Sequence, residues 1–220
     1  MVAIGFNKCA TRSFAGLFER SGHPALHQKL PRHRVWPPGA PRKLGRLMRL
    51  NVEAGRSVFA GVEHYVFYGD LIDSNRRGSF DGNSLFRRIL ADYPNTILLL
   101  NWRDREDWIR SRLRHGHGEF AEREQRLRGL PSLDALCEAW RHDWDQHLAA
   151  VRHCMADRPA QLIEFHLDHD RIEQLVQRLP AYGLRPEHFA DIGRSRDRRP
   201  SPQLERLQRA WSRWRPRAQR

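Results

Sequence analysis

Seven residues near the start of the chain, Asn7-Lys8-Cys9-Ala10-Thr11-Arg12-Ser13, combine a lysine and an arginine with hydroxyl side chains. They follow an apolar run at 2–6 that is typical of a buried strand, and Phe14, Leu17 and Phe18 then recur at helical spacing. The first turn of a helix offers unpaired backbone N–H groups and a positive dipole end, which favour a bound phosphate or sulfate. The segment therefore predicts an anion site at a strand–helix junction.

The order of residues in this loop distinguishes it from the phosphate loop of ATPases. That loop reads G-x-x-x-x-G-K-[ST], with the lysine at its end. Here Lys8 comes early and no Gly-Lys-Ser/Thr occurs, which disfavours a P-loop ATPase without disfavouring anion binding. The alternative is that Lys8 is a surface residue in an ordinary strand–helix turn.

A second set of polar groups follows the clearest buried strand, predicted at 96–102. Arg103 comes directly after it, and Ser111 lies eight residues later in the helix that follows. A guanidinium offers forked donors to a phosphate, and a hydroxyl adds one more. The alternative is that Arg103 pairs with Asp104 or Asp107 and that Ser111 is a bystander.

Alternating apolar and amphipathic segments must position these residues. Strands are predicted at 2–6, 24–27, 65–68, 96–102 and 161–165, and helices at 13–20, 43–54, 83–93, 105–114, 132–156 and 172–179. This alternation predicts an α/β fold with a central parallel sheet covered on both faces, a three-layer α/β/α domain. Such sheets bind ligands at the carboxyl ends of their strands, so we expect chemistry in the loops after Phe6, Tyr68 and Trp102.

Taken together, the two polar stretches resemble the sulfotransferases that use 3′-phosphoadenosine 5′-phosphosulfate (PAPS). In that family a loop reading roughly P/N-K-x-G-T-T/K-S grips the 5′-phosphosulfate, and a later Arg and Ser grip the 3′-phosphate. The chain matches the loop at 7–13 and the pair with Arg103 and Ser111, but Ala10 replaces a Gly and Arg12 a Thr. The resemblance covers roughly residues 1–190 and is greatest to bacterial members whose acceptors are not established.

Two further segments carry the same resemblance. Residues 65–73 resemble the family's middle strand with its following Asp, and residues 140–184 resemble its closing helix–strand–helix. The resemblance implies a P-loop-like nucleotide-binding fold. It also implies in-line transfer of a sulfuryl group from PAPS to a hydroxyl or amine of a small-molecule, glycan or lipid acceptor, without a metal. The co-product is then 3′-phosphoadenosine 5′-phosphate.

The resemblance also implies roles for individual residues. Lys8 would stabilise the charge that develops on the leaving phosphate oxygen. The 5′-phosphosulfate would lie against the loop residues Ala10, Thr11, Arg12 and Ser13, held by their backbone N–H groups and by the two hydroxyls. Arg103 and Ser111 would hold the 3′-phosphate.

A general base must take the proton of the acceptor. Asp70 is our first candidate, because it follows a strand and should lie at the same sheet edge as Lys8. His64, His27 and Asp73 are alternative bases, and Asp70 itself has the alternative role of a turn residue after a glycine.

The charge of the chain is unevenly distributed. The 220 residues carry 39 Lys+Arg against 26 Asp+Glu, a net charge of +13. Residues 194–220 contribute +8 of this, so we expect a sulfotransferase-like α/β domain over 1–193 and a basic extension over 194–220.

The apolar residues of the extension, from Leu204 to Trp214, fit a short helix docked on the domain. A polyanion contact and disorder are the alternatives; no nucleic-acid motif accompanies the extension, which disfavours nucleic acid as the partner.

The remaining composition restricts the class of protein. Three scattered cysteines without a C-x-x-C, and a start that lacks signal-peptide character, lead us to expect a reducing cytoplasm. No apolar run reaches the roughly 18 residues of a membrane span, and twelve histidines without a ligand-type spacing disfavour a metal site. Acceptor contacts are expected in the loops 29–42, 69–82 and 115–131, whose composition specifies neither an acceptor nor an oligomeric state.

Overall fold

The computed structural model describes residues 1–31 and 41–190. Within these ranges five strands form one sheet in the order β2-β3-β1-β6-β7, and every adjacent pair is parallel. The strands are β1 (Val2–Ala3), β2 (Ala25–His27), β3 (Phe67–Gly69), β6 (Leu98–Trp102) and β7 (Leu162–His166). The predicted α/β fold with a central parallel sheet is therefore confirmed.

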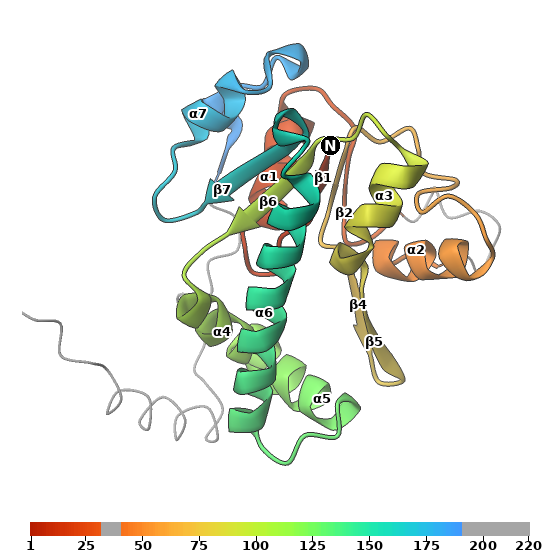
Figure 1. Ribbon diagram of the computed structural model, residues 1–220, viewed down its shortest axis with the longest axis vertical. Helices are drawn as coiled ribbons and strands as arrows, with labels where there is room; N and C mark the ends of the chain where they lie inside the picture. The colour runs from red at the N-terminus through yellow and green to blue at the C-terminus, as the bar shows by residue number, and fades with distance from the viewer. Residues whose placement is uncertain (32–40, 191–220) are drawn as a thin grey trace, which may run out of the picture.

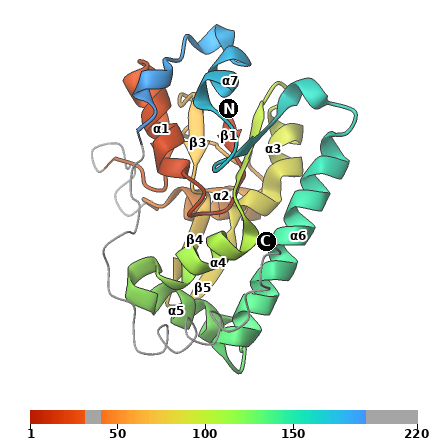
Figure 2. The ribbon, with the colours of Figure 1, turned by 90° about the vertical axis from the view of Figure 1, so that its left-hand side faces the viewer.

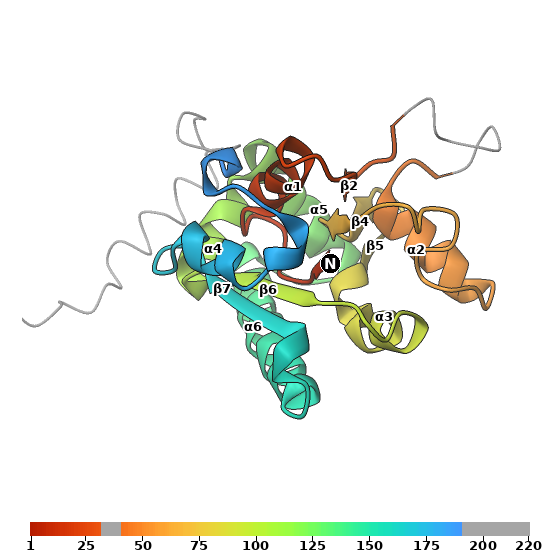
Figure 3. The ribbon, with the colours of Figure 1, turned by 90° about the horizontal axis from the view of Figure 1, so that it is seen from above.

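Helices cover both faces of this sheet (Figures 1 and 3). They are α1 (Thr11–Arg20), α2 (Leu44–Glu53), α3 (Phe86–Asp92), α4 (Arg105–Leu113), α5 (Glu119–Leu127), α6 (Leu133–Met155) and α7 (Ile172–Gln177). Successive side chains of a strand point to opposite faces, which divides the core in two. Ala3 and Leu99 pack with α1 and α7, whereas Val2, Leu98 and Leu100 pack with the helices of the other face.

Two elements occupy segments that the sequence predicted as loops. Residues 69–82 contain an antiparallel hairpin of β4 (Ile72–Asn75) and β5 (Gly78–Asp81), and residues 115–131 contain α5. The hairpin strands are short and largely polar, and the buried residues of α5 are Phe120, Ala121 and the charged Glu124. Figure 2 shows α4, α5 and the hairpin together on one side of the sheet.

Other sequence predictions fall outside the described residues or concern boundaries. The basic extension at 194–220, its docked helix, and most of the loop at 29–42 lie wholly or largely in residues that the structure does not describe. The remaining predicted helices and strands occur within a few residues of their expected bounds. No helix in the described part of the chain combines the length and the apolar character needed to cross a bilayer.

The first strand is shorter than the predicted 2–6 because a side chain, rather than a neighbouring strand, binds the backbone at its end. The Gly5 N–H donates to Oδ1 of Asn101 at 3.1 Å, and Asn101 lies completely buried in β6. The two backbones approach so closely that a Cβ on Gly5 would lie 1.8 Å from the carbonyl oxygen of Asn101. Only glycine fits at this position.

Replacing Gly5 with alanine should therefore force β1 and β6 apart. We expect Gly5→Ala to lower the free energy of unfolding by about 3 kcal/mol or more, measured by urea denaturation. Gly78→Ala is the matched control, because a Cβ there meets nothing within 4 Å. Equal stabilities of the two variants would contradict the close approach.

Candidate active site

A cavity of about 1120 Å³ lies at the carboxyl edge of the sheet. The eight residues that the sequence assigned to donor binding or catalysis all contribute to its wall: Lys8, Ala10, Thr11, Arg12, Ser13, Asp70, Arg103 and Ser111. They come from the β1–α1 loop, the first turn of α1, the residues that directly follow β3 and β6, and α4. Segments that are far apart in the sequence thus face one common space.

Strained backbone is concentrated in this wall. Five non-glycine residues in the described ranges have a positive φ, and four of them line the cavity. These four are Lys8 (φ 71°), Ala10 (55°), Gln28 (59°) and Asp70 (56°). Left-handed backbone costs a non-glycine residue of order 1 kcal/mol or more, and such residues cluster at functional sites.

Helix α1 directs its N-terminus into the cavity without a side-chain cap. Its N-cap residue, Ala10, makes no capping hydrogen bond, and the first turn contains no acidic residue. Thr11 and Ser13 in that turn are 5% and 2% exposed. No carboxylate in the first turn therefore neutralises the positive end of the helix dipole. This end of the helix suits an anionic ligand.

Three buried side chains from other elements fix the loop that leads into α1. Asn101 accepts from the Gly5 N–H and donates to the Cys9 carbonyl. Trp108 of α4 donates its indole N–H to the Asn7 carbonyl at 3.0 Å, and Nε2 of His147 on α6 donates to the Ile4 carbonyl at 2.7 Å. The shape of the loop is therefore set by β6, α4 and α6 together.

Asp70 and His27 lie side by side at the ends of β3 and β2. Oδ2 of Asp70 is 3.8 Å from Nε2 of His27, and the same Nε2 is 3.1 Å from Oγ1 of Thr11. Burial raises the pKa of Asp70 to about 6, and burial, with a smaller contribution from Arg12, lowers the pKa of His27 to about 4. At neutral pH the carboxyl is mostly ionised and the imidazole is neutral.

The other two candidate bases are placed elsewhere. His64 lies outside the cavity wall, where its ring packs against Tyr65 with centroids 4.3 Å apart. Asp73 accepts a hydrogen bond from Nζ of Lys43 at 2.8 Å, and its side chain is only 3% exposed. The geometry thus brings Asp70 and His27 into the cavity and leaves His64 and Asp73 out of it.

Among the described residues, Arg103 pairs with neither Asp104 nor Asp107. Its Nη2 lies 3.6 Å from Oδ1 of Asp168, beyond the end of β7. Asp104 instead caps α4 by accepting from backbone N–H groups, and Asp107 pairs with Arg110. The buried Nε of Arg103 has no hydrogen-bond partner among the described residues, which leaves a donor for a ligand.

Sequence reasoning missed several residues of the wall. Arg110 and Arg114 lie beside Ser111 in the cavity, at the i,i+4 spacing that places two side chains on one helix face. That spacing was a signal in the sequence. The apolar part of the wall had no such signal in the sequence. Its residues Phe165, Leu167 and Phe189 come from the end of β7 and from a segment near residue 190, and only the fold brings them to the cavity.

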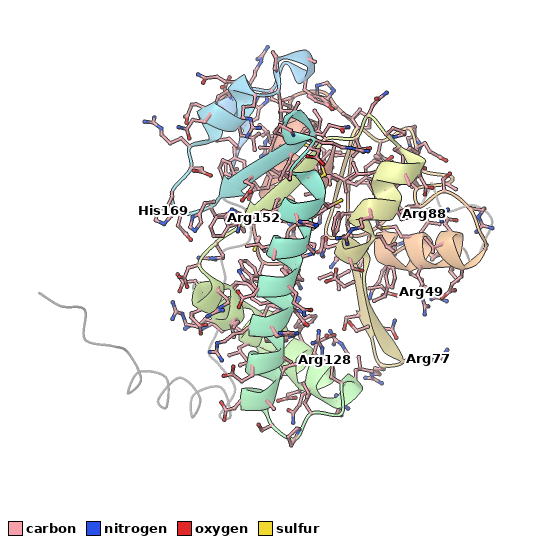
Figure 4. The ribbon with its side chains drawn as sticks, viewed as in Figure 1. Arg49, Arg77, Arg88, Arg128, Arg152 and His169 are labelled. Carbon is pink, nitrogen blue, oxygen red and sulfur yellow. The ribbon has the colours of Figure 1, made fainter. Side chains whose placement is uncertain are left out.

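Many other arginines lie away from the cavity. Figure 4 shows Arg49 on α2, Arg77 at the tip of the hairpin, and Arg88 on α3, all at the periphery. Arg88 pairs with Asp92 at 2.8 Å on the same helix. The basic composition is therefore spread over the surface as well as gathered at the candidate site.

Neither a protein-family model nor a curated protein matches this chain. The cavity and the two motifs that line it are therefore the features of the molecule that indicate a function.

The buried Asp70 carboxylate should make stability depend on pH. Its folded pKa of about 6 lies above the ordinary 3.8, so this contribution to stability is present at low pH and is lost as pH rises through 6. We expect Asp70→Asn to be about 2 kcal/mol more stable than the wild type near pH 8, and equally stable near pH 4. Urea denaturation across this range measures the difference.

His27 also titrates in this range and lies 3.8 Å from Asp70, so the difference between the two proteins contains the Asp70 carboxyl and its effect on His27. A gain or loss of stability that does not vary with pH would contradict the burial of an ionisable carboxyl at this position.

Proposed function

We propose that this chain is a sulfotransferase that moves a sulfuryl group from PAPS to a hydroxyl or amine acceptor. One observation carries the proposal: the β1–α1 loop and the Arg103–Ser111 pair, which resemble the two donor-binding motifs of that family, line the same cavity. In the order β2-β3-β1-β6-β7, the strands that precede the two motifs, β1 and β6, are adjacent and parallel, so both motifs lie at the carboxyl edge, where α/β sheets bind ligands.

The wall of the cavity suits a nucleotide with phosphates at both ends. The uncapped N-terminus of α1, with the hydroxyls of Thr11 and Ser13, would hold the 5′-phosphosulfate. Arg103 and Ser111 would hold the 3′-phosphate, and Arg110 adds a second guanidinium beside them. Phe165, Leu167 and Phe189 form an apolar surface against which the adenine ring of the nucleotide would pack.

The reaction is an in-line displacement at sulfur. The acceptor oxygen or nitrogen forms a new bond to sulfur while the bond from sulfur to the 5′-phosphate oxygen breaks. Lys8 would stabilise the negative charge that appears on that leaving oxygen. Asp70, ionised at neutral pH, would take the acceptor proton.

A bound 3′-phosphate would compete with Asp168 for the guanidinium of Arg103. In the structure its guanidinium faces the carboxylate of Asp168 at 3.6 Å. Asp168 is 44% exposed at its side chain, so it can turn toward solvent at small cost when a phosphate arrives.

A panel of nucleotides tests this proposal. We expect 3′-phosphoadenosine 5′-phosphate and PAPS to raise the melting temperature of the protein by several degrees at about 100 times Kd, since a ligand at that ratio adds about 2.7 kcal/mol. ATP and short oligonucleotides should have little effect. Stabilisation by ATP alone would instead favour a phosphotransfer enzyme, and stabilisation by oligonucleotides alone a polyanion-binding protein.

Lys8 and Arg103 should separate catalysis from binding. With PAPS as donor and a metabolite pool as acceptor source, Lys8→Ala should lower sulfuryl transfer at least about 100-fold while the protein stays folded. Arg103→Ala should raise the Kd of 3′-phosphoadenosine 5′-phosphate about 10-fold to 100-fold in calorimetry, because a charged hydrogen bond is lost.

Arg105→Ala is the matched control for Arg103→Ala. Arg105 lies outside the cavity wall and its Nη1 binds Oδ2 of Asp145 at 2.5 Å. An unchanged Kd in the Arg103 variant, or full activity in the folded Lys8 variant, would refute the corresponding assignment.

A further inference from the structure

One nitrogen of His27 faces two oxygen atoms of the candidate site. Its Nε2 lies 3.1 Å from the hydroxyl oxygen of Thr11 and 3.8 Å from a carboxylate oxygen of Asp70. Only the first distance is a hydrogen bond; the second is close enough for the charge of the carboxylate to act on the ring. All three residues contribute to the cavity wall.

The direction of the bond between His27 and Thr11 depends on the tautomer of the imidazole ring. A neutral imidazole has a proton on one nitrogen and a lone pair on the other, so Nε2 either donates to the hydroxyl or accepts from it. The ionised carboxylate of Asp70 lies 3.8 Å from Nε2, so it repels a lone pair on that nitrogen and attracts a proton there. The arrangement therefore favours Nε2–H as the donor and the Thr11 oxygen as the acceptor.

The direction of this bond determines what the Thr11 hydroxyl can do. A hydroxyl has one proton and two lone pairs, and the bond from His27 occupies one lone pair. Its proton is then left to be donated elsewhere. Thr11 is the first residue of α1, so its hydroxyl stands beside the backbone N–H groups of the first turn.

We propose that His27 is a positioning residue that fixes the Thr11 hydroxyl as a hydrogen-bond donor to an anion bound at the start of α1. It does so by donating its Nε2 proton to one lone pair of the hydroxyl, which leaves the hydroxyl proton for the anion, and Asp70 holds the His27 proton on that nitrogen. His27 is then not the general base. The identity of the anion as the 5′-phosphosulfate group of PAPS rests on the proposed function.

A second buried polar group indicates that this part of the cavity is built for a ligand. Asn7 lines the cavity and is 8% exposed, and its Oδ1 has no hydrogen-bond partner among the described residues. A buried amide oxygen without a partner is costly, and ligands or ordered water commonly satisfy such groups. Its place directly before Lys8 puts this polar atom in the same loop that leads to Thr11.

The test is a cycle of variants at the two positions. His27→Leu removes the donor, His27→Gln keeps an N–H group near the place of Nε2, and Thr11→Val removes the hydroxyl. Calorimetry with 3′-phosphoadenosine 5′-phosphate gives the affinity of each variant. His153→Leu, at an exposed position on α6 outside the cavity wall, is the control and should bind as the wild type does.

We expect His27→Leu and Thr11→Val each to weaken binding about 10-fold, and the double variant to weaken it by about the same factor rather than about 100-fold. His27→Gln should bind within about threefold of the wild type. It should also retain turnover with a metabolite pool as acceptor, because glutamine can donate a hydrogen bond but cannot serve as a base.

Two outcomes would overturn the inference. One is an affinity loss in the double variant that equals the product of the single losses, which means the two side chains act independently. The other is a His27→Gln variant that binds as weakly as His27→Leu. If His27→Leu does not fold, as judged by circular dichroism, His27→Met replaces it in the same cycle.

A separate probe distinguishes this inference from the proposed function. If the wild type does not bind 3′-phosphoadenosine 5′-phosphate, the PAPS assignment fails, and the same cycle is run with inorganic sulfate in thermal denaturation. If the double variant then loses no more of the sulfate-induced rise in melting temperature than each single variant does, the role of His27 is still supported. Absence of any sulfate effect on the wild type would overturn both proposals.

Discussion

The candidate site depends on one buried amide. Asn101 accepts from the Gly5 N–H and donates to the Cys9 carbonyl, so it binds both ends of the loop that leads into α1. Each backbone group left buried without a partner costs about 1–3 kcal/mol, which makes any other conformation of the loop unfavourable while this amide is in place. The left-handed backbone of Lys8 and Ala10 persists because the amide holds the loop from both sides.

The same packing decides which groups in the cavity can react. Cys9 lies completely buried next to the candidate anion site, and burial raises the pKa of its thiol to about 12. At neutral pH the thiol stays protonated and is a poor nucleophile. Asp70 is buried as well, but its pKa of about 6 leaves it mostly ionised. Within the proposed mechanism, the carboxylate rather than the thiol is available to take a proton.

The sequence predicted the strands and helices that have a clear apolar pattern. It also predicted the site residues that come directly after strands. It placed Lys8, Asp70 and Arg103 after three strands, and parallel pairing then brought them to one edge. It did not predict the hairpin or α5, whose polar residues are held by tertiary contacts such as the bond from Ser74 to Glu124 at 2.7 Å. The role of Asn101 had a visible signal, a polar residue in an apolar strand, but its partners come from distant segments.

The two residues that depart from the sulfotransferase pattern fit this structure without loss of the site. Ala10 takes φ 55° and ψ 21°, the left-handed conformation in which glycine is normally preferred, and its small Cβ keeps the strain modest. Arg12 contributes a positive charge that lowers the pKa of Asp70 and so opposes the effect of burial. A threonine at that position would lack this charge, and the carboxyl would hold its proton to higher pH. In the proposed reaction, Arg12 therefore helps to keep a largely buried carboxyl usable as a base at neutral pH.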